Sequence, residues 1–139
     1  MCLYLNVKKT AKTRKSIKSG KSHSKYFTYY KVFRVGFNYS KRYLYSPYYS
    51  GGFNIPYIFT PGYIYRSNVS AQSYRSIRKD RAKLHYGIHV YTSLEYARME
   101  CRGWSSSVVV ECKCLKSDFI AFGYDSEALF TEVYLMRIV

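Results

Sequence analysis

SVVVECKCL, residues 107–115, is the segment that decides the fold. Its alternate residues from Val108 to Cys114 are apolar, whereas the intervening Glu111 and Lys113 are charged. A period of two is typical of a β-strand with one buried face. A free cysteine is a common core residue, so both cysteines of the segment fit that face. We therefore expect a strand that packs its valines and cysteines into a core.

The segments on either side of this strand predict an α+β arrangement. Residues 86–91 (YGIHVY) are expected to form a short strand. Thr92 and Glu95 then have the spacing of a capping box, which predicts a helix from Thr92 to about residue 101, ended by Gly103. Residues 129–139 are expected to form one last strand. This order predicts a small sheet covered on one side by the helix.

The chain before residue 70 is expected to be mostly extended. Residues 29–35 (YYKVFRV) predict a strand with Lys31 and Arg34 exposed to solvent. Residues 54–66 predict two further extended pieces, joined by a turn at Pro61-Gly62. Residues 26–139 are therefore predicted to form a single α+β domain. Its sheet is expected to be small, mixed or antiparallel, with one or two covering helices.

The charge of the chain is unevenly divided. Residues 1–79 contain 16 Lys or Arg and no Asp or Glu, whereas residues 80–139 contain 7 Lys or Arg and all 8 acids. Cations without acids repel one another and destabilise a compact state unless anions offset them. The asymmetry predicts a polyanionic partner, and a phosphate backbone is the commonest one. An acidic protein or an anionic membrane surface is the alternative partner, and solubility alone is a third interpretation.

Two segments concentrate these cations. Residues 8–25 carry eight Lys or Arg and little that is apolar, which predicts a flexible basic arm after a short apolar start within residues 1–25. Residues 70–84 are expected to form a basic surface helix capped by Ser70. The predicted nucleic-acid-binding residues are Lys8, Lys9, Lys12, Arg14, Lys15, Lys18, Lys21, Lys25, Arg75, Arg78, Lys79 and Arg81.

Other features narrow the classes of function. The apolar run at the N-terminus is too short for a signal peptide, and no window reaches the roughly 20 apolar residues of a membrane span. We therefore expect an intracellular or virion protein with free thiols. Cys112-x-Cys114 has half of a zinc-site spacing, but only Cys101, His85 and His89 lie near enough in sequence to complete the site. The residues predict no metal, no cofactor and no catalytic triad.

The chain resembles a group of small proteins from large DNA viruses and bacteriophages. The resemblance covers most of residues 26–115 in short pieces, after a start at Met1-Cys2-Leu3. It implies a viral source and carries no defined activity. The basic N-terminal segment departs from the pattern, as expected of a protein packed against DNA or a capsid interior. The matching pieces are Tyr30-Lys31-Val32-Phe33, Ser46-Pro47-Tyr48, Gly87-Ile88-His89-Val90-Tyr91, Leu94-Glu95-Tyr96-Ala97 and Val108-Val109-Val110-Glu111-Cys112.

Residues 87–97, followed by the valine-rich strand, also resemble the central part of ADP-ribosyltransferase folds. That resemblance implies that Tyr91 stacks on a nicotinamide and that Glu132 is a catalytic acid, in a pocket shared with His89. The chain departs from the family in its compressed spacing and in offering only Arg34 for the early motif.

Two functions are therefore expected. The first is a non-enzymatic viral structural or nucleic-acid-associated protein, whose α+β half docks on protein partners. The alternative is a small ADP-ribosyltransferase-like enzyme.

Overall fold

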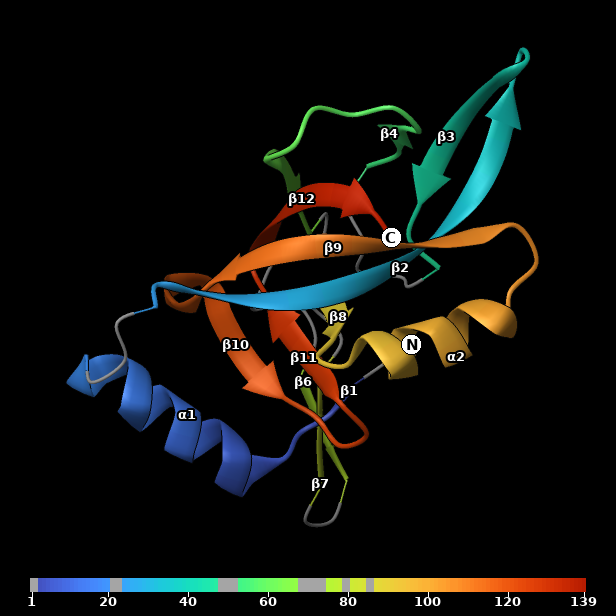
Figure 1. Ribbon diagram of the computed structural model, residues 1–139. Coiled ribbons are helices and arrows are strands. Elements are labelled where there is room, and N and C mark those ends of the chain that lie inside the picture. Colours follow the sequence, from blue (N-terminus) through green and yellow to red (C-terminus); the bar gives the residue numbers. More distant parts are fainter. Residues whose placement is uncertain (1–2, 21–23, 48–52, 68–74, 79–80, 85–86) are drawn as a thin grey trace.

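The computed structural model describes residues 3–20, 24–47, 53–67, 75–78, 81–84 and 87–139. In these residues a nine-stranded antiparallel sheet has the strand order β10-β11-β8-β2-β9-β12-β5, and β3 and β4 extend it from β2 (Figure 1). A second sheet has the order β1-β7-β6. Two α-helices within the described residues accompany the sheets, which agrees with the predicted α+β class. The elements are β1 Leu3–Tyr4, α1 Val7–Ser19, β2 Tyr26–Asn38, β3 Lys41–Tyr45, β4 Ile55–Pro56, β5 Tyr63–Arg66, β6 Arg75–Arg78, β7 Arg81–Leu84, β8 Ile88–Tyr91, α2 Leu94–Arg102, β9 Ser107–Leu115, η1 Lys116–Asp118, β10 Phe119–Phe122, β11 Glu127–Phe130 and β12 Glu132–Ile138.

β2 and β9 form the centre of the large sheet. They pair antiparallel along nine residues, from Tyr26 opposite Leu115 to Arg34 opposite Ser107. The alternation in residues 107–115 is confirmed, because Val110 and both cysteines are fully buried while Lys113 is exposed. Burial raises the pKa of the Cys112 thiol to about 12, so this thiol stays protonated and apolar at neutral pH.

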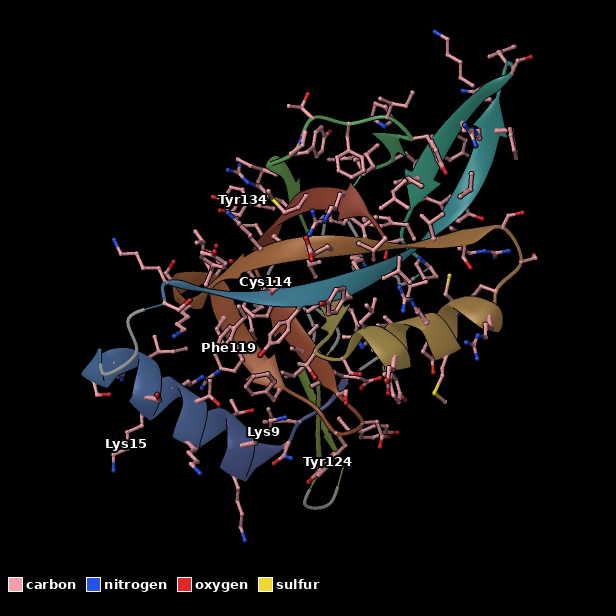
Figure 2. The ribbon with its side chains drawn as sticks, in the orientation of Figure 1. Lys9, Lys15, Cys114, Phe119, Tyr124 and Tyr134 are labelled. Atoms are coloured by element: carbon pink, nitrogen blue, oxygen red, sulfur yellow. The ribbon has the colours of Figure 1, made fainter. Side chains whose placement is uncertain are left out.

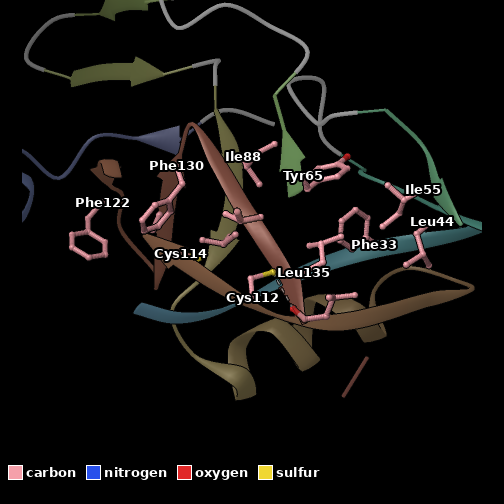
Figure 3. Close-up of a cluster of buried hydrophobic side chains, with 14 residues drawn as sticks. Phe33, Leu44, Ile55, Tyr65, Ile88, Cys112, Cys114, Phe122, Phe130 and Leu135 are labelled. Carbon is pink, nitrogen blue, oxygen red and sulfur yellow. Dashed lines mark hydrogen bonds between the residues drawn. The ribbon is translucent and has the colours of Figure 1, made fainter. Parts of the chain in front are cut away.

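The main core lies on the face of the sheet that carries these cysteines (Figure 3). Every strand of the large sheet contributes to it, including the short β3 and β4 through Leu44 and Ile55. The ring of Phe33 meets the ring of Tyr65 edge-on, with their centroids 5.1 Å apart. Because side chains from both ends of the strand order meet in one cluster, the sheet curves around its own core.

α2 covers the opposite face. Its Ala97 is buried against Val32, Tyr91 and Val109. The helix begins one residue later than the capping box predicts, because Ser93 is the N-cap and its Oγ accepts a hydrogen bond from the Tyr96 amide at 3.3 Å. It ends at Gly103, as predicted.

Three predictions about elements are corrected by the structure. The predicted helix over residues 70–84 is wrong in its described part, where Arg75–Arg78 and Arg81–Leu84 form paired antiparallel strands; residues 70–74 and 79–80 lie outside the described residues. β7 also pairs with β1, through Leu3 opposite Leu84. The single last strand predicted over residues 129–139 is two strands, β11 and β12, that pair with different neighbours.

The third correction concerns the basic arm. The expectation of a flexible segment over residues 8–25 is not confirmed, because α1 occupies Val7–Ser19. Only residues 21–23 of the segment lie outside the described part. The helix runs beside β10, at the end of the strand order (Figure 1).

Candidate nucleic-acid interface

The ends of α1 carry the local signals that a helix needs. The Asn6 side chain accepts a hydrogen bond from the Lys9 amide at 3.2 Å and so caps the N-terminus. Gly20 ends the helix in a left-handed conformation, with φ of 61°, and its amide donates to the Ile17 carbonyl. Between these two caps, the sequence of α1 has only a weak apolar stripe. The remaining stability of α1 therefore comes from its contacts with the sheet.

α1 is attached to the backbone of β10. The hydroxyl of the buried Thr10 donates to the Phe122 carbonyl at 3.2 Å and accepts from the Phe122 amide at 3.0 Å. One turn later, the Arg14 guanidinium donates to the Ile120 carbonyl at 2.6 Å. An edge strand exposes a row of unpaired backbone groups, and α1 covers that row here. The helix thus lies along β10, in a fixed orientation.

This attachment turns the lysines of α1 outward. Thr10, Thr13 and Ile17 are the residues of α1 with buried or half-buried side chains. With 3.6 residues per turn, Lys8, Lys12 and Lys15 fall on the opposite side of the helix. Figure 2 shows Lys15 extending from α1 away from the rest of the chain. Lys18 is also exposed, at the edge of the same side. We call Lys8, Lys12, Lys15 and Lys18 the basic face.

The remaining two cations of α1 flank its packed side. The Lys9 ammonium lies 4.5 Å from the centre of the Phe122 ring, a cation–π contact. The Arg14 hydrogen bond to β10 gives that residue a positioning role, which its prediction as a binding residue did not include. Lys9 and Arg14 are nonetheless exposed. Phosphate contact by the outward lysines therefore leaves the attachment of α1 intact.

A second group of cations lies beyond the C-terminal end of α1. A cleft of about 390 Å³ is lined by Ile17 of α1 and its C-cap Gly20, by Lys25 just before β2, and by Lys116 of η1. The Lys116 amide donates to the Lys25 carbonyl at 3.1 Å, which holds these two residues together. The Lys116 ammonium lies 5.2 Å from the Phe27 ring centre. The basic surface therefore continues from the helix onto β2 and η1.

Lys113 adds one more cation to this surface. It is exposed on the outer face of β9, and its ammonium lies 4.9 Å from the centre of the half-exposed Tyr26 ring. The site prediction did not include Lys113 or Lys116, because both follow residue 79 and lie among acids in the sequence. The alternation of residues 107–115 could have indicated the outward position of Lys113.

Among the described residues, no acid forms an ion pair with the basic face. In the described part of the chain, the ion pairs join Arg66 to Glu132, Arg137 to Glu111 and His89 to Glu127, and none includes a residue of α1. Lys8 and Lys12, four residues apart on a helix, repel each other. An anion that binds between them relieves this repulsion.

The other predicted binding residues lie in the smaller sheet or outside the described residues. Arg75 and Arg78 lie on β6 and Arg81 lies on β7, in the sheet that begins with β1. Lys21 and Lys79 lie outside the described residues. The structure therefore brings together the cations of α1, Lys25 and the unpredicted cations near η1.

The pocket implied by the ADP-ribosyltransferase resemblance is not assembled in the expected way. His89 and Tyr91 are both buried, with their ring centroids 5.3 Å apart. The acid beside them is Glu127, whose Oε1 lies 3.6 Å from His89 Nε2. Glu132 instead pairs with Arg66 at 2.6 Å, where β12 meets β5. The acid paired with His89 is therefore Glu127, and not the expected Glu132.

Lys31 is the second correction in this region. It was predicted to be exposed, but it is fully buried, and its ammonium donates to the His89 carbonyl at 3.0 Å. Burial lowers the pKa of Lys31 to about 7, and the nearby Cys112 opposes this shift. Burial also lowers the pKa of His89, against the effect of Glu127. These groups are packed inside the protein, where a substrate cannot reach them without a rearrangement.

In the described residues, no group of three or more His, Cys, Asp or Glu side chains has an arrangement that could hold a metal ion. No helix among them is both long and apolar enough to cross a membrane.

Comparison of the chain with protein-family models, curated proteins and solved structures found no significant match. The resemblance to viral proteins therefore stays a prediction.

Proposed function

We propose that this chain is a non-enzymatic nucleic-acid-binding protein that contacts phosphates through the basic face of α1. One observation carries the proposal: the four lysines of the basic face are mounted on a helix that hydrogen bonds to the sheet edge, and no acid of the described chain pairs with them. A cationic helix fixed on a folded body presents its charges together. The resemblance to small viral proteins supports a place for this activity in a virion or its assembly.

The expected mode of binding is electrostatic. Lys8 and Lys15 are separated by seven residues, about 10 Å along the helix axis, so the basic face reaches several phosphates. Lysine is a point charge that contacts phosphate without reading the base sequence. Binding therefore releases counterions and weakens as salt rises, with little dependence on sequence.

The test is a comparison of salt dependence between two matched variants. Lys8→Gln/Lys12→Gln removes two charges four residues apart on α1. Arg98→Gln/Arg102→Gln removes two exposed charges with the same spacing on α2. Both variants have the same net charge. Affinity for a DNA duplex is measured by fluorescence anisotropy from about 50 to 200 mM salt.

We expect only the α1 variant to change the slope of log affinity against log salt. Each lost phosphate contact reduces the magnitude of that slope by about 0.9 for a duplex, so the α1 variant should lose about two units. Equal slopes for the two variants would show that net charge alone governs binding and would refute the role of α1. Absence of measurable binding by the unaltered chain at low salt would refute the proposed function itself.

A further inference from the structure

A β-hairpin formed by β2 and β3 projects from the body of the protein (Figure 1). The pairing runs from Arg34 opposite Tyr45 to Asn38 opposite Lys41. Its base is fixed in the core by Phe33 and Leu44, both fully buried. Toward the tip the same strands carry large aromatic residues that the core does not cover. The hairpin is therefore anchored in the core at its base and has an exposed aromatic end.

The tip of the hairpin holds a tyrosine in a conformation that tyrosine rarely adopts. Asn38 pairs with Lys41, so the loop is the two residues Tyr39 and Ser40, with φ of 48° and 66°. Two positive φ values identify a type I′ turn, which favours Asn-Gly over bulky residues. A non-glycine residue in this region costs about 1 kcal/mol or more. Tyr39 is 95% exposed, so no packing within the described chain compensates for this cost.

One face of the hairpin is a row of rings and cations. A Cβ added to Gly36 would lie 2.3 Å from the Tyr43 ring, so that ring lies against the backbone of the opposite strand. The Tyr43 and Tyr45 ring centroids are 5.8 Å apart. The Arg34 guanidinium lies 5.8 Å from the Tyr45 ring centre and 5.2 Å from the Trp104 ring centre. The row thus alternates flat aromatic surface with positive charge.

The other face has the same chemistry. Phe37 is 68% exposed and stands opposite Arg42 in the pairing. The Arg42 guanidinium lies 4.0 Å from the centre of the Tyr57 ring. A groove of about 740 Å³ runs beside them, lined by residues that include Phe37, Tyr39 and Tyr43. Arg42 and Lys41 provide cations at this groove.

The charge of the hairpin indicates which partner it suits. The sequence has no acid before residue 80, and in the described chain no ion pair includes a hairpin residue. Exposed rings beside unpaired cations match a strand of nucleic acid, whose bases stack on aromatic rings while its phosphates meet Lys or Arg. A duplex does not satisfy these rings, because its bases are already stacked. An acidic protein surface would pair with the cations of the hairpin but would not require flat, separately exposed aromatic rings.

We propose that the β2–β3 hairpin is a binding site for single-stranded nucleic acid, in which Tyr39 and Phe37 stack on unpaired bases and Lys41 and Arg42 contact the adjoining phosphates. This inference rests on the proposed function, because it names the form of nucleic acid that the protein engages. α1 then supplies contacts that do not depend on strandedness, and the hairpin supplies the preference for a single strand.

The experiment compares a thymidine oligonucleotide of about 20 nucleotides with a duplex of equal length, a size that exceeds one such site. Tyr39→Asn removes the ring and introduces a residue that a type I′ turn favours, so the hairpin is kept. Tyr39→Phe keeps the ring. Tyr124→Asn is the matched control, because Tyr124 is 56% exposed near a different turn. Thermal unfolding confirms that each variant is folded.

We expect Tyr39→Asn to weaken single-strand binding about tenfold, the effect of one lost stacking contact, and to leave duplex binding unchanged. Tyr39→Phe and Tyr124→Asn should retain the affinity of the unaltered chain. Equal losses for single strand and duplex, equal behaviour of the Asn and Phe variants, or displacement of the oligonucleotide by polyglutamate at equal charge concentration would each overturn the inference.

The outcomes also separate this inference from the proposed function. If Lys8→Gln/Lys12→Gln changes the salt slope and Tyr39→Asn changes nothing, the role of α1 stands and the hairpin site is wrong. If Tyr39→Asn weakens single-strand binding while the α1 variant behaves like its α2 control, the hairpin stands and the role of α1 is wrong.

Discussion

Replacement of Lys31 by methionine should change how the stability of the protein depends on pH. Lys31 is fully buried, and burial lowers its pKa to about 7 from 10.5. Between these two values the unfolded chain binds a proton that the folded chain has released. Stability therefore rises with pH across this window and is lost as pH falls toward 7. Methionine has a similar length and no titration, so Lys31→Met should remove this rise.

The magnitude follows from the two pKa values. Between pH 7 and pH 9, the proton held only by the unfolded chain contributes about 2 kcal/mol to the free energy of unfolding. Above pH 9 the buried thiols act in the opposite direction, because their pKa values are raised in the folded chain. The thiols are present in both proteins, so the difference between them isolates Lys31.

The substitution also removes the hydrogen bond to the His89 carbonyl. Loss of a hydrogen bond costs about 0.5–1.5 kcal/mol, which lowers the free energy of unfolding of the variant at every pH. The loss of a buried ammonium raises the free energy of unfolding of the variant at neutral pH. This offset does not affect the test, because only the change with pH is diagnostic.

The assay is urea unfolding at pH 7, 8 and 9 for both proteins. The difference in unfolding free energy should shift by about 2 kcal/mol in favour of the unaltered chain between pH 7 and 9. If the unfolding free energies of the two proteins change in parallel with pH, to within about 0.5 kcal/mol, Lys31 has an ordinary pKa and the account of its burial is refuted.

Three further substitutions test other contacts. Thr10→Val leaves the Phe122 amide without its partner and should cost about 1–3 kcal/mol, with faster hydrogen exchange in α1; unchanged exchange would contradict the attachment of α1. Gly87→Ala should destabilise the protein more than Gly62→Ala, because both glycines have φ near 90° but only a Cβ at Gly87 would lie 2.7 Å from Ile120. Thermal unfolding of the two variants measures the difference, and equal losses of stability would contradict the close contact at Gly87. Glu127→Gln should lower the pKa of His89 further, whereas Glu132→Gln should leave it unchanged, as NMR titration of the His89 ring would show; equal titration curves would contradict the pairing.

The sequence was most informative where a local pattern matches a local cause. The alternation in residues 107–115 reflects the two faces of β9, and both are found as predicted. The end of α2 at Gly103 was equally visible. The start of that helix was misplaced by one residue because Thr92 and Ser93 are both good caps, and Thr92 instead donates to the Ser126 carbonyl of a neighbouring turn.

The sequence was least informative where contacts join distant residues. Alternation along residues 29–35 places Lys31 on the same face of the strand as Phe33. Lysine is rarely buried, however, so Lys31 was expected to be exposed. Its acceptor lies 58 residues away in sequence. Similarly, residues 8–25 have the composition of a mobile arm, and the contact that orders them joins Thr10 to a strand 112 residues away. The candidate lysines could be predicted, but not their common outward direction.

The covering of β10 by α1 has a consequence for how the charge of this protein should be removed. A truncation before residue 20 would expose the backbone of Ile120 and Phe122 along a free strand edge. Such edges join neighbouring molecules into extended sheets, especially when nearby side chains are apolar. A truncated chain would therefore tend to self-associate, and its loss of nucleic-acid binding would be confounded with precipitation. Charge neutralisation within an intact α1 changes the electrostatics of the protein without exposing this strand edge.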